Sequence, residues 1–225
     1  MNARFGGEAT GGQARRTAGI VIEPCPRQFA HILRYVDPVN GCVAAKLLPG
    51  EYYVALRDEM VTTVLGSCIA ACIYDPYRGI GGMNHFMLPE SAADPQAKDS
   101  SRMSRATLYG YFAMEGLINE ILKQGCRKRD LRAKLFGGGQ IISGMTAIGM
   151  QNIRFAKDYL RTEGIPVESA DVGLVYPRKV NFFPQTGRVK VKRLTALHND
   201  TIMTREEVYR DKLSSEETSG DLELF

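Results

Sequence analysis

The sequence contains no tryptophan, only three histidines and an odd number of cysteines. The cysteines are Cys25, Cys42, Cys68, Cys72 and Cys126, and their spacing does not repeat. An odd, irregular set argues against a disulfide framework and lacks the spacing of a four-ligand metal site. We therefore expect reduced thiols and no bound metal.

Long apolar runs and strong charge are also missing. No stretch approaches the roughly 20 apolar residues that a membrane-spanning helix needs. The first residues lack the apolar segment and cleavage site of a secretory signal. The net charge of +4 is mild for a dedicated nucleic-acid binder. These absences predict a cytoplasmic protein that neither inserts into membranes nor binds nucleic acid.

The chain divides into three predicted parts. Residues 1–28, rich in Gly, Ala, Arg and Thr, indicate a flexible extension. Residues 29–203 form the predicted domain, and 204–225 a charged tail with at most a turn or two of helix.

A short helix is expected near residues 29–35. Strands are predicted at 52–56, 60–65, 68–74, 80–88, 133–136, 166–172, 178–183 and 188–194, and amphipathic helices at 108–122 and 149–161. This pattern favours a layered mixed α/β domain.

Residues 62–89 are the most informative segment. Gly66 and Ser67 interrupt two strand-like runs, so the chain must turn sharply just before Cys68. Such a turn would present the Cys68 thiol and release nearby backbone N–H groups from the sheet. Those N–H groups could stabilise an oxyanion, and either Cys68 or Ser67 could be a nucleophile. A lone cysteine in an apolar strand is, however, more often a small core residue.

A thiol nucleophile needs a base, and His85 is the best placed of the three histidines. It follows a tight turn, so hairpin pairing could bring it beside Cys68. A Cys–His pair supplies a thiolate for attack and a proton for the leaving group. The hydroxyl of Thr62 or Thr63 could orient the imidazole, and the local pattern does not choose between them.

Two other features have structural interpretations. Residues 139–146 have the glycine spacing of a phosphate-binding loop, but Met145 stands where the lysine must be. We interpret the glycines at 137–139 as letting the backbone pass close to a neighbouring element. A basic cluster comprising Arg127, Lys128, Arg129, Arg132 and Lys134 is either solvated or a contact for acidic helices.

Several blocks together resemble one family. Leu65-Gly66-Ser67-Cys68, Tyr74-Asp75-Pro76 and Gly81-Gly82-Met83-Asn84-His85-Phe86-Met87-Leu88-Pro89 closely resemble CheD, the chemoreceptor glutamine deamidase family of bacterial chemotaxis. The likeness extends to residues 48–53, 134–138, 148–153, 171–173, 186–189 and 222–225. The resemblance therefore covers the chain from about residue 35 onward.

The resemblance implies a fold and a set of site residues. The fold would be α+β, a layered α/β/β/α sandwich with mixed sheets, similar to the catalytic domain of cytotoxic necrotizing factor toxins. The nucleophile would be Cys68, the catalytic histidine His85 and the third catalytic residue Thr62. Backbone N–H groups near Gly66 and Ser67 would support the oxyanion.

The implied activity is hydrolysis of glutamine side chains to glutamate on methyl-accepting chemotaxis receptors, through a thioester and without a cofactor. The implied partners are the cytoplasmic domain of these receptors and, in some bacteria, the CheC phosphatase. Two alternatives stay open at this point. One is a non-catalytic module that binds receptors or CheC, and the other is hydrolysis of glutamyl methyl esters through the same acyl-enzyme.

Overall fold

The computed structural model describes residues 19–88, 105–140, 146–194 and 200–219. Sheet A contains, in spatial order, β1 (Leu33–Asp37), β2 (Cys42–Lys46), β4 (Glu59–Leu65), β9 (Arg178–Phe183) and β10 (Arg188–Arg193). Sheet B contains β3 (Tyr52–Ala55), β6 (Ile80–Asn84), β5 (Ile69–Asp75), β7 (Arg132–Gly137) and β8 (Val167–Val172). The helices are α1 (Arg105–Lys123), α2 (Thr146–Thr162) and α3 (Asp200–Ser219), with short 3-10 turns η1 (Arg27–Phe29) and η3 (Lys128–Asp130).

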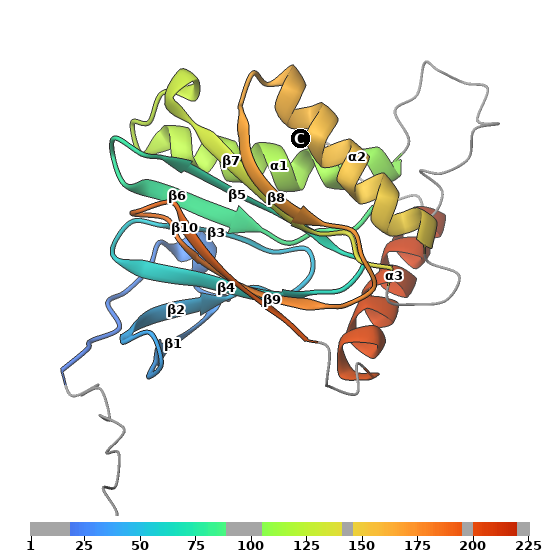
Figure 1. The fold of residues 1–225 in the computed structure, drawn as a ribbon, viewed down its shortest axis with the longest axis horizontal. Helices are drawn as coiled ribbons and strands as arrows, with labels where there is room; N and C mark the ends of the chain where they lie inside the picture. The colour runs from blue at the N-terminus through green and yellow to red at the C-terminus, as the bar shows by residue number, and fades with distance from the viewer. Residues whose placement is uncertain (1–18, 89–104, 141–145, 195–199, 220–225) are drawn as a thin grey trace, which may run out of the picture.

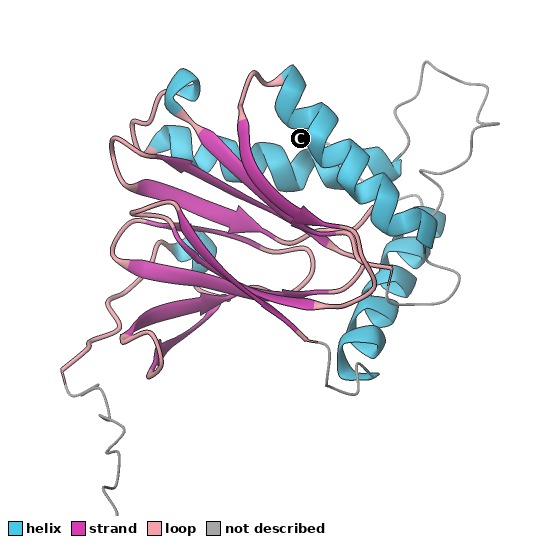
Figure 2. Ribbon diagram, in the orientation of Figure 1, coloured by secondary structure: helices cyan, strands magenta, loops and turns pink. Residues whose placement is uncertain are grey.

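The two sheets pack face to face as a sandwich (Figures 1 and 2). Helices α1 and α2 cover the outer face of sheet B, whereas α3 stands at one end of the sandwich. Both sheets are mixed, because β2 pairs parallel with β4 and β7 parallel with β8 while the other pairs are antiparallel. The predicted α+β class with two mixed sheets is confirmed. No helix in the described part of the chain is long and apolar enough to cross a bilayer.

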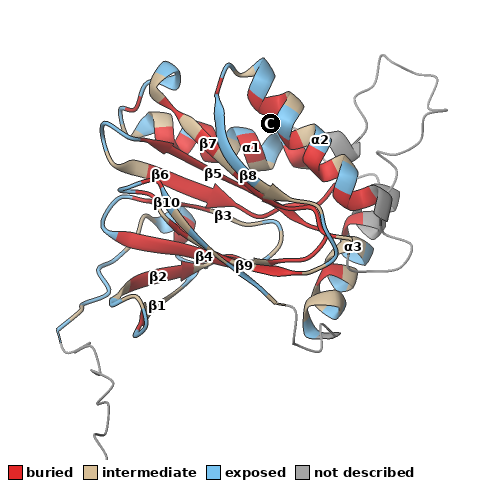
Figure 3. Cartoon of the chain, in the orientation of Figure 1, coloured by how far each residue is buried: buried red, intermediate tan, exposed pale blue. Residues whose placement is uncertain are grey.

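Strand β5 is the centre of the core. All seven of its residues are buried, since sheet A covers one of its faces and helices α1 and α2 the other (Figure 3). A strand buried on both faces reads as a continuous apolar run instead of an alternating one, and this explains the run at 69–74. The nucleophile candidate Cys68 immediately precedes this strand and is itself buried.

The N-terminal part of the domain differs from the prediction. Where a short helix was expected near residues 29–35, the chain forms η1 and then the β1–β2 hairpin. The hairpin turn is built by Asp37, whose Oδ1 accepts a hydrogen bond from Asn40 N at 2.7 Å, and by Gly41 at φ +63°. Asp, Asn and Gly favour such turns, and this local chemistry outweighs the short apolar spacing that suggested a helix.

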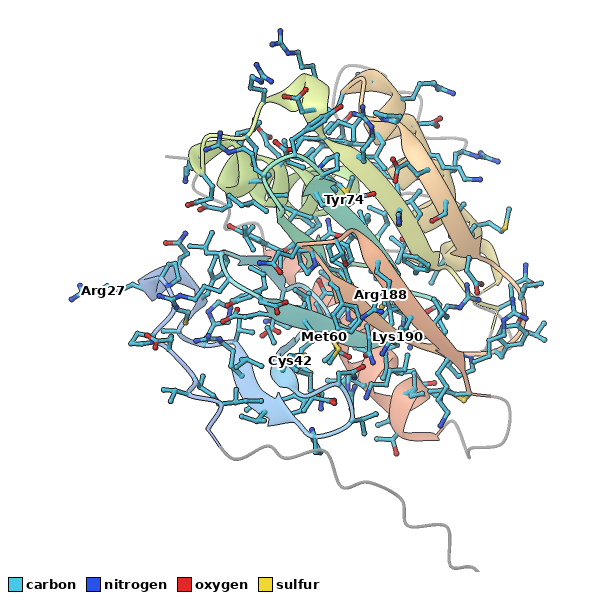
Figure 4. The ribbon with its side chains drawn as sticks, turned by 60° about the vertical axis from the view of Figure 1, so that its left-hand side comes forward. Arg27, Cys42, Met60, Tyr74, Arg188 and Lys190 are labelled. Carbon is cyan, nitrogen blue, oxygen red and sulfur yellow. The ribbon has the colours of Figure 1, made fainter. Side chains whose placement is uncertain are left out.

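The β10 edge of sheet A is basic. Arg188 and Lys190, both labelled in Figure 4, place their cationic groups over the ring of Phe183, at 4.7 Å and 5.3 Å from its centroid. Cationic side chains on an edge strand oppose pairing with a strand of another chain.

The predicted division at 203/204 falls inside α3, which continues to Ser219. Most of the predicted extension, residues 1–18, lies outside the described residues. The three-part division therefore stays a prediction, while the helix in the tail is much longer than the turn or two expected from its charge.

Candidate active site

The turn between β4 and β5 carries the chain from sheet A to sheet B and consists of Gly66, Ser67 and Cys68. Each of its three carbonyl groups accepts a hydrogen bond from the body of the protein. The pairs are Gly66 O with Gly139 N (2.7 Å), Ser67 O with Asn152 Nδ2 (2.9 Å) and Cys68 O with Gly138 N (2.7 Å). The turn is therefore fixed through its acceptors, and its N–H donors are left for another group.

The glycines at 137–139 make this anchoring possible. A Cβ added at Gly137, where φ is +111°, would lie 2.2 Å from the Cys68 carbonyl oxygen. A Cβ added at Gly139 would lie 2.8 Å from the Gly66 carbonyl oxygen. Only glycine permits so close a backbone approach. The predicted structural role of these glycines beside the site is confirmed.

Cys68 and His85 lie together because the residues next to them pair. Ile69 N donates to Phe86 O at 2.9 Å, and Phe86 N donates to Ile69 O at 3.0 Å. This bridge prolongs the β5–β6 hairpin beyond Asn84 and brings the thiol and the imidazole to one end of the sheet. The juxtaposition predicted from the tight turn is present in the structure.

The imidazole of His85 is held by Thr63. Thr63 Oγ1 lies 2.8 Å from His85 Nδ1 and 2.9 Å from the carbonyl oxygen of Leu47. A hydroxyl has a single proton, and the carbonyl can only accept, so the arrangement satisfying both contacts has Nδ1 protonated. Nε2 is then the basic nitrogen, and it has no hydrogen-bond partner among the described residues. The ring is thus prepared to take a proton at Nε2.

Thr62, the third residue implied by the family resemblance, does not contact the histidine. Its Oγ1 donates instead to Asn181 Oδ1 at 2.6 Å. Successive side chains of a strand point to opposite faces, so only one of the two threonines of β4 can face His85. In this geometry the hydroxyl beside His85 is that of Thr63, and the catalytic role implied for Thr62 stays a prediction.

A glutamate from α3 fills the space in front of the turn. Glu206 Oε1 accepts from Gly66 N at 2.8 Å and from Cys68 N at 3.2 Å. Its Oε2 accepts from Ser67 N at 2.7 Å and from Ser67 Oγ at 2.6 Å. The three backbone donors thus converge on one carboxylate, as an oxyanion site requires. Because the Ser67 hydroxyl faces Glu206, it is not placed as a nucleophile activated by His85.

The electrostatics of this closed arrangement disfavour an ion pair between thiolate and imidazolium. Burial, followed by the charge and hydrogen bond of Glu206, raises the pKa of the Cys68 thiol. Burial, followed by the charge of Arg205, lowers the pKa of His85 to about 3. In this arrangement the thiol is protonated and the imidazole neutral, so the nucleophile is not yet activated.

The Cys68 Sγ, a His85 ring nitrogen and a Glu206 oxygen lie within 4.8 Å of one another, a grouping that could suggest a metal site. Each Glu206 oxygen, however, already accepts two hydrogen bonds from the turn. A carboxylate offers about four lone-pair sites, so none is left for a cation in this arrangement. The donor set fits a hydrogen-bonded carboxylate better than a coordinated ion.

Sequence reasoning missed two residues that shape the site. Asn152 on α2 ties the turn to the chain after His85, because its Oδ1 accepts from Leu88 N at 2.8 Å while its Nδ2 binds Ser67 O. Glu206 had one available signal. The apolar residues of α3 that are buried or partly buried follow helical spacing, and the carboxylate of Glu206 lies in the same series: Ile202, Met203, Tyr209 and Leu213.

The basic cluster at 127–134 lies far from this site. Arg132 pairs with Tyr74 at the end of β5 opposite to Ile69, several residues from the turn. Arg127 bonds Asp130 at 2.7 Å and Lys128 bonds Glu163 at 2.5 Å, so part of the cluster is already paired with acids. Of the other two histidines, His31 is exposed and His198 lies outside the described residues.

Comparisons with known proteins identify relatives over nearly the whole chain. A family model described as CheD chemotactic sensory transduction matches residues 87–193. A relative from Halorhodospira halophila, named probable chemoreceptor glutamine deamidase CheD, is 47% identical over 212 residues, covering 94% of this chain and 98% of the relative. A relative of the same name from Methylobacillus flagellatus is 50% identical over 207 residues, covering 91% and 100%.

Among solved structures, the Bacillus licheniformis hypothetical protein YfiH aligns at 14% identity over 54% of this chain and 50% of that one, with a TM-score of 0.35. That likeness is too slight to carry an argument. The sequence relatives are decisive, since they match more than nine-tenths of the chain and are identical at about half of the aligned positions. This chain belongs to the CheD family.

Proposed function

We propose that this protein hydrolyses the side-chain amide of selected glutamines on the cytoplasmic part of chemoreceptors, in the cytoplasm and without a cofactor. The names of its relatives support the reaction. The observation that carries the assignment to residues is the site itself: Cys68 and His85 meet beside three N–H groups that hold a glutamate carboxylate.

The steps follow from the positions of the groups. His85 Nε2 takes the thiol proton of Cys68, and the sulfur attacks the amide carbon. The N–H groups of Gly66, Ser67 and Cys68 stabilise the oxygen as it becomes negative. The imidazolium then protonates the leaving nitrogen, and ammonia departs from a thioester. A water molecule activated by His85 hydrolyses the thioester to give glutamate. Thr63 positions the imidazole through Nδ1 in each step.

The test is mass spectrometry of a receptor cytoplasmic fragment after incubation with this protein or with its Cys68→Ala variant. The expected result is conversion of particular glutamines to glutamates by the unmodified protein alone. Ala leaves out one sulfur atom, so folding should be retained, and circular dichroism checks this. A fragment methylated on its glutamates, supplied in parallel, shows whether esters are also cleaved. Conversion of neither substrate would contradict the proposal.

One observation favours a second function, binding without turnover. Cys68 is 0% exposed and His85 is 1% exposed, so the site as described admits no substrate. A module that binds receptors or a CheC-type phosphatase would not need an open site. In that case the receptor fragment would bind equally to the unmodified protein and to Cys68→Ala, with no glutamine converted by either.

A further inference from the structure

The nucleophile of this protein is closed off by its own chain. An enzyme acting on a glutamine of another protein must bring that side chain to the sulfur of Cys68. The sulfur, the imidazole and the backbone donors are all beneath Glu206, which is itself 1% exposed. The element that brings Glu206 there is α3, which stands at the end of the sandwich (Figure 1).

Helix α3 packs on the body of the protein along one side, through Met203, Tyr209 and Leu213 as well as Glu206. Among its described side chains only Glu206 and Leu213 are buried. Tyr209, on the same side, lies against Gly50, where an added Cβ would come within 2.9 Å of its hydroxyl. The other described side chains are partly buried or, at five positions, exposed: Thr201, Thr204, Val208, Asp211 and Lys212. A helix buried along a narrow stripe can leave the body of the protein without unfolding the core.

The group that α3 inserts has the chemistry of the reaction product. Deamidation of a glutamine leaves a glutamate carboxylate, with its oxygens at the backbone donors and its carbon beside the sulfur. Glu206 has its carboxylate on the N–H groups of Gly66, Ser67 and Cys68, with an oxygen within 4.8 Å of Sγ. It is moreover a glutamate side chain projecting from an α-helix.

We propose that α3 is a built-in product mimic: it occupies the groove of the substrate helix, holds Glu206 where the product carboxylate forms, and must withdraw before turnover. The inference rests on the proposed function for the identity of the product. Closure of the site by α3 does not depend on the proposed function and can be measured separately. In the resting state α3 then occupies the active site of its own chain, and a receptor helix competes with α3 for the groove.

Closure is tested by alkylation of Cys68 with iodoacetamide, followed by peptide mass spectrometry. Glu206→Ala removes the carboxylate that binds the turn, and Glu207→Ala removes the same charge one residue further along the helix. Loss of hydrogen bonds to a charged group should accelerate alkylation of Cys68 by about tenfold or more in Glu206→Ala. Glu207→Ala should behave like the unmodified protein. Equal rates in all three proteins would overturn the inference, whatever the enzymatic activity.

Product mimicry is tested by Glu206→Gln, which turns the mimic into an internal substrate. The sulfur of Cys68 forms a bond to the side-chain carbon, and the bond from that carbon to nitrogen breaks. The thiol proton leaves with the nitrogen as ammonia. Water then supplies a hydroxyl to the carbon and a proton to the sulfur, so the encoded amide becomes a carboxylate. Mass spectrometry should find glutamate at position 206, and the amide should persist when Cys68→Ala is present in the same chain.

The receptor fragment separates the remaining outcomes. Faster conversion by Glu206→Ala than by the unmodified protein, with self-conversion of Glu206→Gln, supports both proposals. Conversion at the same rate by the unmodified protein, Glu206→Ala and Glu207→Ala overturns the product mimic and leaves the deamidase assignment intact. An amide at position 206 that persists in a protein able to convert the receptor also overturns the mimic. Faster alkylation with no conversion of any amide overturns the deamidase assignment and, with it, the identity of Glu206 as a product.

Discussion

The two neighbouring threonines of β4 offer a matched test of the site. Thr63→Val and Thr62→Val each replace a hydroxyl by a methyl group of similar size in a buried position of the same strand. Thr63 contacts His85 Nδ1 and Leu47 O, whereas Thr62 contacts Asn181. Only the first change should slow deamidation, because only that hydroxyl fixes the imidazole with Nε2 toward the nucleophile.

The magnitude follows from the charge of the imidazole during the reaction. When His85 accepts the thiol proton, the contact from Nδ1 to Thr63 becomes a hydrogen bond from a cation, worth about 1.5–3 kcal/mol. Losing it in the transition state alone lowers kcat about 10- to 150-fold. Stability should also fall by about 1–3 kcal/mol, since the Leu47 carbonyl is left without the hydroxyl proton.

The assay is conversion of glutamines in the receptor fragment, with kcat and KM determined separately for both variants. The fall should appear in kcat, and Thr63→Ser, which keeps the hydroxyl, should restore most of it. Urea unfolding corrects for unequal stability. If Thr62→Val lost activity while Thr63→Val kept it, the assignment of the third residue from this geometry would be wrong, and the family expectation for Thr62 would be right.

Three further changes probe the supports of the site. Asn152→Ala removes both hydrogen bonds that tie the turn to α2 and should cost about 1–3 kcal/mol in urea unfolding for each buried group left unpaired, while Gln151→Ala should cost little. Gly137→Ala places a Cβ 2.2 Å from the carbonyl of the turn and should abolish activity, while Gly164→Ala, with φ of +68° and nothing within 4 Å, should cost only about 1–2 kcal/mol of strain. The pKa of His85 is lowered from 6.5 to about 3, so the unfolded chain binds the proton first on acidification. The free energy of unfolding should therefore fall by about 1.4 kcal/mol per pH unit between those pH values, and His85→Gln should remove this slope.

Most of the secondary-structure elements could be predicted from the sequence, and so could two residues of the site, Cys68 and His85. Alternating or continuous apolar runs marked the strands from β3 to β10 closely, because burial on one or both faces leaves a direct trace in the pattern. The pairing of Cys68 with His85 was also accessible, since a hairpin links them over a short stretch of chain. The segment at 33–46 was not, because turn chemistry and not hydrophobic spacing decided it.

The choice between Thr62 and Thr63 could not be made locally. It depends on which face of β4 meets sheet B. Every residue of that strand except Val64 is buried, so the burial pattern does not show which side chains point to which face. Glu206 was still harder to find. It is separated from the turn by about 140 residues, and its helix is so strongly charged that it reads as a solvated tail. Contacts of this range follow from the packing of the whole fold.

The burial of Cys68 has a consequence for the chemistry of oxidation. Peroxide attacks thiolates that solvent can reach and converts them to sulfenic and then to irreversible sulfinic acids. With its sulfur covered by α3 and its proton retained, Cys68 is protected on both counts, whereas Cys25 and Cys42 are partly exposed. The resting protein would thus keep the Cys68 thiol reduced. Oxidation of Cys68 would be confined to the state in which α3 has withdrawn from the site.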